Sequence, residues 1–289
     1  MTEFKETELD ERAIKMAKVL SADAVEKAGS GHPGSPISLA PVAYTLYQHF
    51  IKHDPNDPTG KPRSLHPSGG HASLTQYVQL YFSGYGVTLD DLKNFRGGAA
   101  TRTPGHPEYG LTPGIEMTTG PLGQGFASAI GFAYGERFQR GLLDPETPKE
   151  DSPFYHKIWA ICGEGDIEEG ISGEAASLAA NQKLGNLTVI FDANRIQIEG
   201  DTNLVLAEDV LKRFQPTAGT PTSSASSSPT APTRRTSRAW LTSSQGREGR
   251  SGPAEAHQGS LPDRLADPGR PTTVLPRQAG YRAVAGLQG

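Results

Sequence analysis

The sequence predicts an α/β fold in which a parallel sheet is flanked by helices. Two apolar runs, Ile158–Cys162 (IWAIC) and Leu187–Phe191 (LTVIF), have the length and composition of strands that are buried on both faces. The Ala-rich segment Glu169–Leu184 between them has the composition of a helix, and Gly163–Gly165 is expected to form a turn. Strand, helix and strand over this length form a crossover unit, so we expect the two strands to lie parallel in one sheet.

Further helices are predicted before this unit. Residues 9–28 place apolar side chains at helical spacing, and Gly29 is a natural stop. A second helix is expected to start with Ser35 as its cap and Pro36 in its first turn, and to run through Ile51. Residues 54–70 are rich in turn formers, Ser73–Phe82 is predicted to be helical, and another helix follows the loop GPLGQG at 120–125.

The composition divides the 289 residues into a globular part, 1–215, and a low-complexity tail, 216–289. The tail has no Ile, Phe, Lys, Asn, Met or Cys and is crowded with Ser, Thr, Pro, Ala, Gly and Arg. Such a segment buries too little apolar surface to offset the entropy lost on ordering its backbone, so we expect disorder.

Charge and hydropathy argue against two classes of partner. The tail holds nine Arg and four acidic residues, a net charge of +5; because the whole chain carries −4, residues 1–215 carry −9. An acidic domain argues against nucleic acid as the main partner. The sequence shows no basic-then-apolar leader and no apolar stretch long enough to span a membrane, and its single Cys162 is expected to be a buried, inert thiol. These features predict a cytoplasmic protein.

Two polar side chains follow the two predicted strands. Glu164 comes after the first strand and Asn194 after the second, so both should lie at the carboxyl edge of the sheet. Carboxylate and amide oxygens suit Mg²⁺ or Ca²⁺, and Mg²⁺ often completes its shell with phosphate oxygens. Gly163 and Gly165 would let the backbone approach an anion, with N–H groups supplied by the following helix. These residues indicate a metal–diphosphate site, although glycines at such a turn are often only structural.

A second glycine-rich loop and three histidines fit the same chemistry. The loop GPLGQG could present backbone N–H groups to phosphate, or it could be only a turn. His32, His71 and His106 each lie beside glycine, which favours tight loops, and imidazoles there could bind phosphate or transfer protons. The remaining histidines are expected to be surface or packing residues, with a role for His66 left open: His49, His53, His66, His156 and His257.

Several distinctive segments follow one another along residues 9–215: EKAGSGHPGSPISLAP, SGGHASL, RTPGHPEYG, TTGPLGQGFASAIGFA, CGEGDIEEGISGEAASLA and NLTVIFDANRIQIEG. Together they resemble transketolase, a thiamine-diphosphate enzyme. The HPG, TPGHPE and GPLGQG combination points to this family more than to dihydroxyacetone synthase, phosphoketolase or the deoxyxylulose phosphate synthase group, which share some of these features.

The resemblance implies a role for each matching residue. The metal ligands would be Glu164, Asn194 and the backbone oxygen of Ile196, and Glu164 stands where most members have Asp, so either Mg²⁺ or Ca²⁺ is considered. The thiamine diphosphate would be lined by His71, Gly120, Leu122, Gly165 and Ile198. His32 and His106 would be the catalytic, proton-transferring groups, and Glu169 would lie at a subunit contact near the cofactor. Gly69 replaces a usual Asn.

The implied reaction, in the pentose phosphate pathway, transfers a two-carbon ketol unit from a ketose phosphate to an aldose phosphate. Full-length members of the family continue for several hundred residues and form homodimers whose active sites use both subunits. The chain is therefore expected to be truncated. The alternative function is a catalytically incomplete fragment that binds thiamine diphosphate and Mg²⁺, inactive alone or dependent on a separate chain.

The tail suggests a reading-frame break. After Arg213-Phe214-Gln215 the family typically continues Ala-Tyr-Gly-Trp-His-Thr, whereas this chain continues Pro-Thr-Ala-Gly-Thr-Pro. The codons CCU ACG GCU GGC ACA CC encode the second sequence, and one G added in front regroups them into the first. We hypothesise that residues 216–289 are a frameshift product. The alternative is a basic tail that binds an acidic partner.

Overall fold

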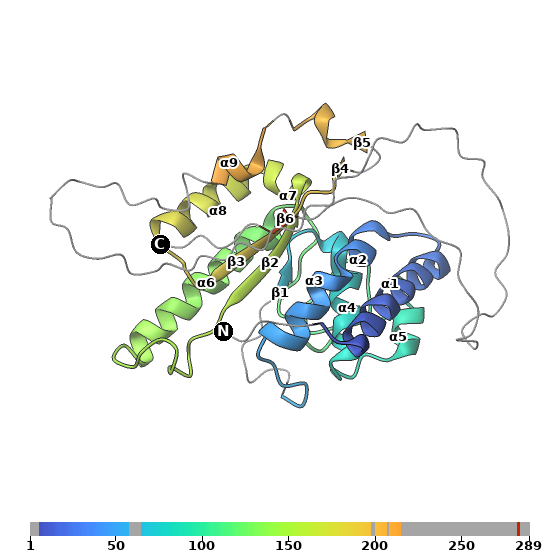
Figure 1. Ribbon diagram of the computed structural model, residues 1–289, viewed down its shortest axis with the longest axis horizontal. Coiled ribbons are helices and arrows are strands. Elements are labelled where there is room, and N and C mark those ends of the chain that lie inside the picture. Colours follow the sequence, from blue (N-terminus) through green and yellow to red (C-terminus); the bar gives the residue numbers. More distant parts are fainter. Residues whose placement is uncertain (1–5, 58–64, 198–199, 207, 215–281, 284–289) are drawn as a thin grey trace.

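The computed structural model of the chain describes residues 6–57, 65–197, 200–206, 208–214 and 282–283 (Figure 1). Its centre is a sheet with the strand order β1-β2-β3-β6. The strands are β1 (Leu65–Pro67), β2 (Ile158–Gly163), β3 (Leu187–Asp192) and β6 (Arg282–Ala283). The predicted crossover unit is confirmed, since β2 and β3 pair in parallel with Ile158 opposite Leu187. β1 pairs with β2 in parallel, and β6 pairs with β3 in the antiparallel direction.

The sheet is buried on both faces, as its apolar runs predict. Along β2, Ile158, Ala160 and Cys162 pack into one hydrophobic cluster, whereas Ile161 belongs to the other. Cys162 is only 2% exposed, which confirms the expected buried thiol, and burial raises the pKa of that thiol well above its usual value.

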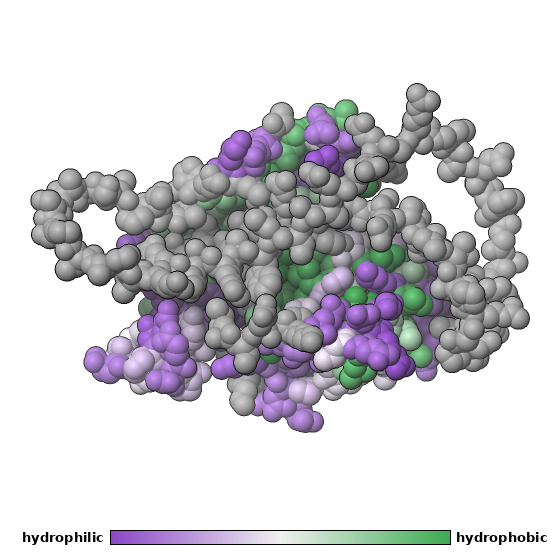
Figure 2. All heavy atoms as spheres, in the orientation of Figure 1, coloured by the Kyte–Doolittle hydropathy of each residue, from purple (hydrophilic) through white to green (hydrophobic). Residues whose placement is uncertain are grey.

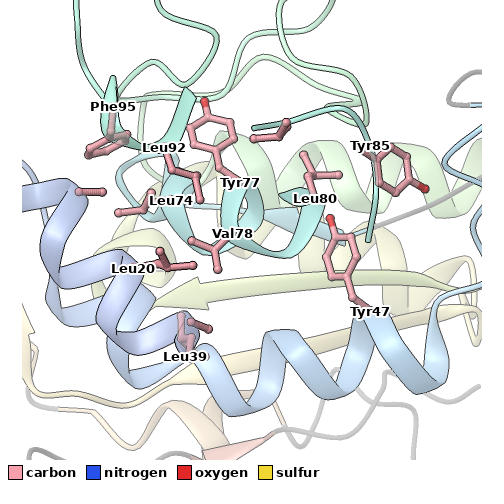
Figure 3. Packing of buried hydrophobic residues seen from close by; sticks show 14 of the residues in the cluster. Leu20, Leu39, Tyr47, Leu74, Tyr77, Val78, Leu80, Tyr85, Leu92 and Phe95 are labelled. Carbon is pink, nitrogen blue, oxygen red and sulfur yellow. The ribbon is translucent and has the colours of Figure 1, made fainter. Parts of the chain in front are cut away.

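Five of the α-helices lie beside β1 and cover one face of the sheet (Figure 1). They are α1 (Glu8–Ala28), α2 (Gly34–Ser38), α3 (Ala40–Thr45), α4 (Ser73–Phe82) and α5 (Leu89–Lys93). The predicted helices at 9–28 and 73–82 are confirmed, and Gly29 ends α1 in the left-handed conformation with φ 62°. Figure 3 shows the core of this half, where Leu74 and Val78 of α4 point toward Leu20 of α1.

The prediction of one helix from Ser35 to Ile51 is wrong in detail. Helix α2 starts at Gly34, and Ser35 forms no side-chain cap. The helix breaks at Leu39, because Pro41 has no N–H to donate to the preceding turn. After α3 the chain continues as a π-helical turn, η1 (Leu46–Phe50).

The opposite face is covered by α6 (Gln124–Leu143) and α8 (Gly170–Asn181). The predicted turn at Gly163–Gly165 is also wrong in detail, because Glu164 and Gly165 already belong to the short helix α7 (Glu164–Glu168). The loop after α6 projects from one end of the molecule and carries hydrophilic residues on its surface (Figures 1 and 2).

Short elements complete the described structure. Strand β1 lies inside the segment predicted to be only turn-rich, and at three residues it is too short to leave a pattern in the sequence. Beyond β3 come β4 (Ile196–Gln197), β5 (Gly200–Asp201), η3 (Thr202–Leu204) and α9 (Val210–Phe214), and η2 (Gly70–Ala72) precedes α4. Among the described residues no helix is long and apolar enough to cross a membrane.

Of the predicted disordered tail, the structure describes only Arg282 and Ala283, which form β6. Every other tail residue, and the predicted boundary after Gln215, lies outside the described residues.

The start of α1 is fixed by a carboxylate whose effect depends on pH. Asp10 Oδ2 accepts hydrogen bonds from the Thr7 backbone N–H at 2.8 Å and from its hydroxyl at 2.6 Å, and Tyr44 donates to Oδ1 at 2.9 Å. The hydrogen bonds from Thr7 lower the pKa of Asp10 to about 2. A lowered pKa means that the ionised side chain stabilises the fold above the usual value near 3.8, and that this contribution fades as the pH falls toward 2.

We therefore expect Asp10→Asn to be less stable than wild type at pH 7, with a stability difference that shrinks as the pH falls below 4. Urea unfolding of both proteins at pH 7, 5 and 3 measures this difference. Asp90→Asn, which removes an exposed carboxylate from α5, is the control and should change stability little at any of these pH values. A difference for Asp10→Asn that stays constant with pH would contradict the assignment.

Candidate functional site

The two polar residues predicted at the carboxyl edge of the sheet meet there. Glu164 is the first residue of α7, directly after β2, and Asn194 follows β3. Glu164 Oε1 accepts a hydrogen bond of 3.0 Å from the backbone N–H of Arg195, so its carboxylate lies against the turn that carries Asn194. The last residue pair of the two strands, Gly163 and Asp192, brings a second carboxylate to the same place.

The turn after β3 is held by its own side chains. Asn194 donates from Nδ2 to Asp192 Oδ2 at 3.1 Å, and its Oδ1 accepts from the backbone N–H of Ile196 at 2.9 Å. Arg195 between them has φ 60°, a left-handed conformation that is strained for a residue with a β-carbon. The hydrogen bonds on both sides of Arg195 hold it there, and strained backbone of this kind is common at binding sites.

The electrostatics of this turn favour a cation. Glu164 Oε2 is buried and has no hydrogen-bond partner among the described residues. Burial raises the pKa of Glu164, and burial together with the Glu164 charge raises the pKa of Asp192 to about 6. A bound cation would give the orphaned oxygen a partner and reduce the repulsion between the two carboxylates, so these residues fit a divalent metal.

The candidate metal ligands are oxygen atoms of three different kinds: a carboxylate, a side-chain amide and a backbone carbonyl. Within the described part of the chain, no group of three or more His, Cys, Asp or Glu side chains is placed to hold a metal ion. The set predicted from the sequence needs only one such side chain, Glu164, and adds the Asn194 amide and the Ile196 backbone oxygen. The structure brings Glu164 and Asn194 together, and Ile196 follows within the same turn.

A residue that the sequence analysis missed joins the two glycine-rich turns. Asp166 is 1% exposed; its Oδ1 accepts from the Gly123 N–H at 3.0 Å and its Oδ2 accepts from the Gly163 N–H at 2.9 Å. Gly123 caps α6 and Gly163 caps α7, so one carboxylate holds the two helix N-termini together. The signal in the sequence was an acidic residue three positions after Gly163, the position of a capping carboxylate.

The loop GPLGQG packs directly on Gly165, the residue after the candidate metal ligand Glu164. A β-carbon on Gly165 would lie 3.1 Å from Leu122 Cδ1, so the Leu122 side chain covers this glycine. Gly123 has φ +76°, and a β-carbon there would lie 2.8 Å from Glu169 Cβ and 3.0 Å from Ser172 Oγ. The loop can therefore approach α7 and α8 this closely only with glycine at 123.

The three loop histidines gather beside this loop. The rings of His32 and His71 contact each other edge to face with centroids 5.1 Å apart. A β-carbon on Gly70 would lie 2.9 Å from His106 Cδ2 and 2.5 Å from the Thr119 carbonyl oxygen, which places His106 between Gly70 and Gly120. His71 is half-buried, whereas His32 and His106 are exposed.

Two of these histidines favour the neutral imidazole. Partial burial lowers the pKa of His32, and the charges of Arg96 and His106 lower it further. Burial also lowers the pKa of His71, as does His32, while Asp166 acts in the opposite direction. Neutral imidazoles near pH 7 can accept protons, as proton-transfer groups must.

The remaining predicted residues fall into two groups. His49, His53 and His156 contact Asp10, the Tyr47 carbonyl and the Phe154 carbonyl respectively, as expected for packing residues. Ile198 and His257 lie outside the described residues, and the structure does not describe the side chain of His66.

Comparison with known proteins identifies the fold and the family. Residues 9–223 match the sequence model of the family described as "Transketolase, thiamine diphosphate binding domain". The chain belongs to the transketolase family. The match ends eight residues beyond the boundary predicted from composition.

Similar proteins share the same part of the chain. The transketolase of Mycobacterium leprae is 53% identical over 211 residues, which are 72% of this chain and 30% of that protein. The transketolase of Geobacillus stearothermophilus is 48% identical over 208 residues, 72% of this chain and 30% of that protein. The crystal structure of the Campylobacter jejuni transketolase aligns with a TM-score of 0.67 at 45% identity, covering 74% of this chain and 32% of that one. The chain thus spans about a third of the length of these relatives.

The crowding at Gly123 predicts opposite effects for two Gly→Ala changes in or next to α6. Gly123→Ala should lower the free energy of unfolding by about 2 kcal/mol, because alanine disfavours the left-handed conformation and its β-carbon would meet Glu169. Gly131→Ala, inside α6 with open space around its β-carbon position, should raise it by about 0.5–1 kcal/mol. Urea unfolding measures both. Equal effects would mean that the loop is not held as the structure describes.

Proposed function

We propose that this chain is the cofactor-diphosphate-binding part of a transketolase, whose complete form transfers a two-carbon ketol unit from a ketose phosphate to an aldose phosphate. The observation that carries the proposal is the meeting of Glu164 and Asn194 at the edge of the sheet, with the buried Glu164 oxygen lacking a partner. Family membership supports the same reaction.

One set of residues would bind the metal and another would bind thiamine diphosphate. Glu164, Asn194 and the backbone oxygen of Ile196 would hold a divalent metal, which would offset the negative charge of the diphosphate. Thiamine diphosphate would be lined by five residues: His71, Gly120, Leu122, Gly165 and Ile198. When bound, thiamine diphosphate supplies the carbanion chemistry of ketol transfer.

The two exposed histidines, His32 and His106, are proposed to transfer protons. Both side chains are exposed and close to His71, so a sugar phosphate could reach them. In this proposal they accept and return protons at the substrate hydroxyl groups, while His71 faces the cofactor. The lowered pKa of His32 supports its role as a proton acceptor near neutral pH.

Glu164 affects the choice of metal. Its side chain is one methylene longer than Asp, so the carboxylate must fold back, and here it does so onto the Arg195 N–H. Mg²⁺ requires close to octahedral geometry at short distances, whereas Ca²⁺ tolerates longer and less regular contacts. We propose Mg²⁺ as the metal, with Ca²⁺ as the alternative that the longer side chain would tolerate better.

The complete protein is proposed to be a cytoplasmic homodimer of the pentose phosphate pathway. The location and the pathway rest on the family alone. The exposed apolar side chains of Phe138 and Leu142 on α6 support a subunit contact, and Glu169, at the start of α8, is proposed to lie at such a contact near the cofactor. The homodimer is proposed for the complete protein and not for this chain by itself.

The assignment of Asn194 predicts its effect on cofactor binding. Isothermal calorimetry with thiamine diphosphate and Mg²⁺ should show binding to the wild-type chain, and Asn194→Ala should weaken it by at least about tenfold because a metal ligand is lost. Asn181→Ala, at the exposed end of α8, is the matched control and should bind like wild type. Equal affinity of the two variants would contradict the ligand assignment.

A ketol-transfer assay separates the proposed function from its alternative, an incomplete fragment that only binds the cofactor. Because the chain spans about a third of its relatives, we expect no turnover by the purified chain alone. Turnover is expected only after a separate chain is added that carries the two thirds of a transketolase that this chain does not span. Turnover by the chain alone would overturn the view that it is catalytically incomplete.

A further inference from the structure

Arg96 lies at the base of the loop that leads to His106. It has φ 59°, a strained left-handed conformation for arginine, and its backbone N–H donates to the Thr103 carbonyl at 3.1 Å. Thr103 in turn donates from Oγ1 to the Asp91 carbonyl of α5 at 2.6 Å. The backbone at Arg96 therefore fastens the segment just before His106 to the end of α5.

The guanidinium of Arg96 reaches a second loop, the one that carries His32. Its Nη1 donates to Ser30 Oγ at 3.3 Å, two residues before His32. On the other side, a β-carbon on Gly105 would lie only 2.7 Å from Nε, so the guanidinium packs on the residue next to His106. One side chain thus lies between the neighbours of both histidines.

The preceding residue strengthens the same junction. Phe95 is buried, and its Cε1 lies 3.3 Å from the β-carbon position of Gly31, the residue before His32. Gly31 has φ +136°, a conformation that side chains rarely adopt. The close contact with Phe95 and this backbone conformation together favour glycine at position 31.

We propose that Arg96 is a positioning residue that joins the loop of His32 to the loop of His106 and so sets both imidazoles at the rim of the site. The functional meaning of this junction rests on the proposed proton-transfer roles of the two histidines. Lysine could not replace arginine fully, because only the planar guanidinium offers donors in a fixed fork and a flat face for Gly105 and Phe95.

The charge of Arg96 affects the pKa of His32, and this effect distinguishes a positioning role near His32 from a purely structural role. The groups that face His32 are Arg96, His106 and His71. Because a nearby positive charge disfavours protonation, removal of the guanidinium must raise the pKa of His32, whereas a lysine that keeps the charge should leave it low.

The test is a proton NMR titration of the histidines in the chain without cofactor, combined with the nuclear Overhauser effect between the rings of His32 and His71. Arg96→Gln should shift the His32 titration midpoint upward and weaken the ring-to-ring signal. Arg102→Gln removes the same charge from the same loop, where Arg102 contacts Gly86 and Asp91 instead, and should change neither readout.

Arg96→Lys separates charge from shape, and it decides the outcome if Arg96→Gln does not fold. It should keep the low midpoint of His32 and still weaken the ring-to-ring signal. The proposal is overturned if Arg96→Gln leaves both readouts as in wild type, if Arg102→Gln shifts them equally, or if Arg96→Lys leaves the ring contact intact. Since no cofactor is present, a failure of thiamine diphosphate binding would not produce any of these results.

Discussion

The carboxylate of Asp166 accepts a backbone hydrogen bond from each of two glycines, Gly123 and Gly163, that cap the N-termini of α6 and α7. Such charge-assisted hydrogen bonds contribute about 1.5–3 kcal/mol each, and without Asp166 one buried and one partly buried N–H group would lose their acceptor. The carboxylate also matches the positive ends of both helix dipoles. The Asp166 carboxylate therefore sets the distance between the loop before α6 and the start of α7, which carries Glu164. The contact of Leu122 with Gly165 depends on that distance.

Much of the architecture follows from patterns in the sequence that have one dominant cause. The two apolar strands, the helix ended by Gly29 and the helix 73–82 could be predicted because burial and local backbone preference agree there. The second helix could not be predicted in detail, because Pro41 and Leu39 break a stretch whose composition alone is helical. Strand β1 is defined by its hydrogen bonds to β2, and three residues carry no periodicity of their own.

The site was predictable where residue type and sheet topology act together. Glu164 and Asn194 follow parallel neighbouring strands, so their meeting could be expected from the chain alone. The contribution of Asp166 and Arg96 depends on contacts across 43 and 66 residues of sequence, to Gly123 and Ser30 respectively, and no local pattern encodes such distances. The departure of Glu164 from the family pattern was visible, but its hydrogen bond to Arg195 was not.

The two faces of β2 take part in different cores, and this separation has an evolutionary consequence. Ile158, Ala160 and Cys162 pack with α6 and α8, whereas Ile161 packs with the helices beside β1. Substitutions on opposite faces share few partners, so their energetic effects should add instead of interfering. Each half of the domain can therefore accumulate core substitutions without compensation from the other half. Substitutions on either face must, however, leave the backbone of β2 unchanged, because both cores are built on it.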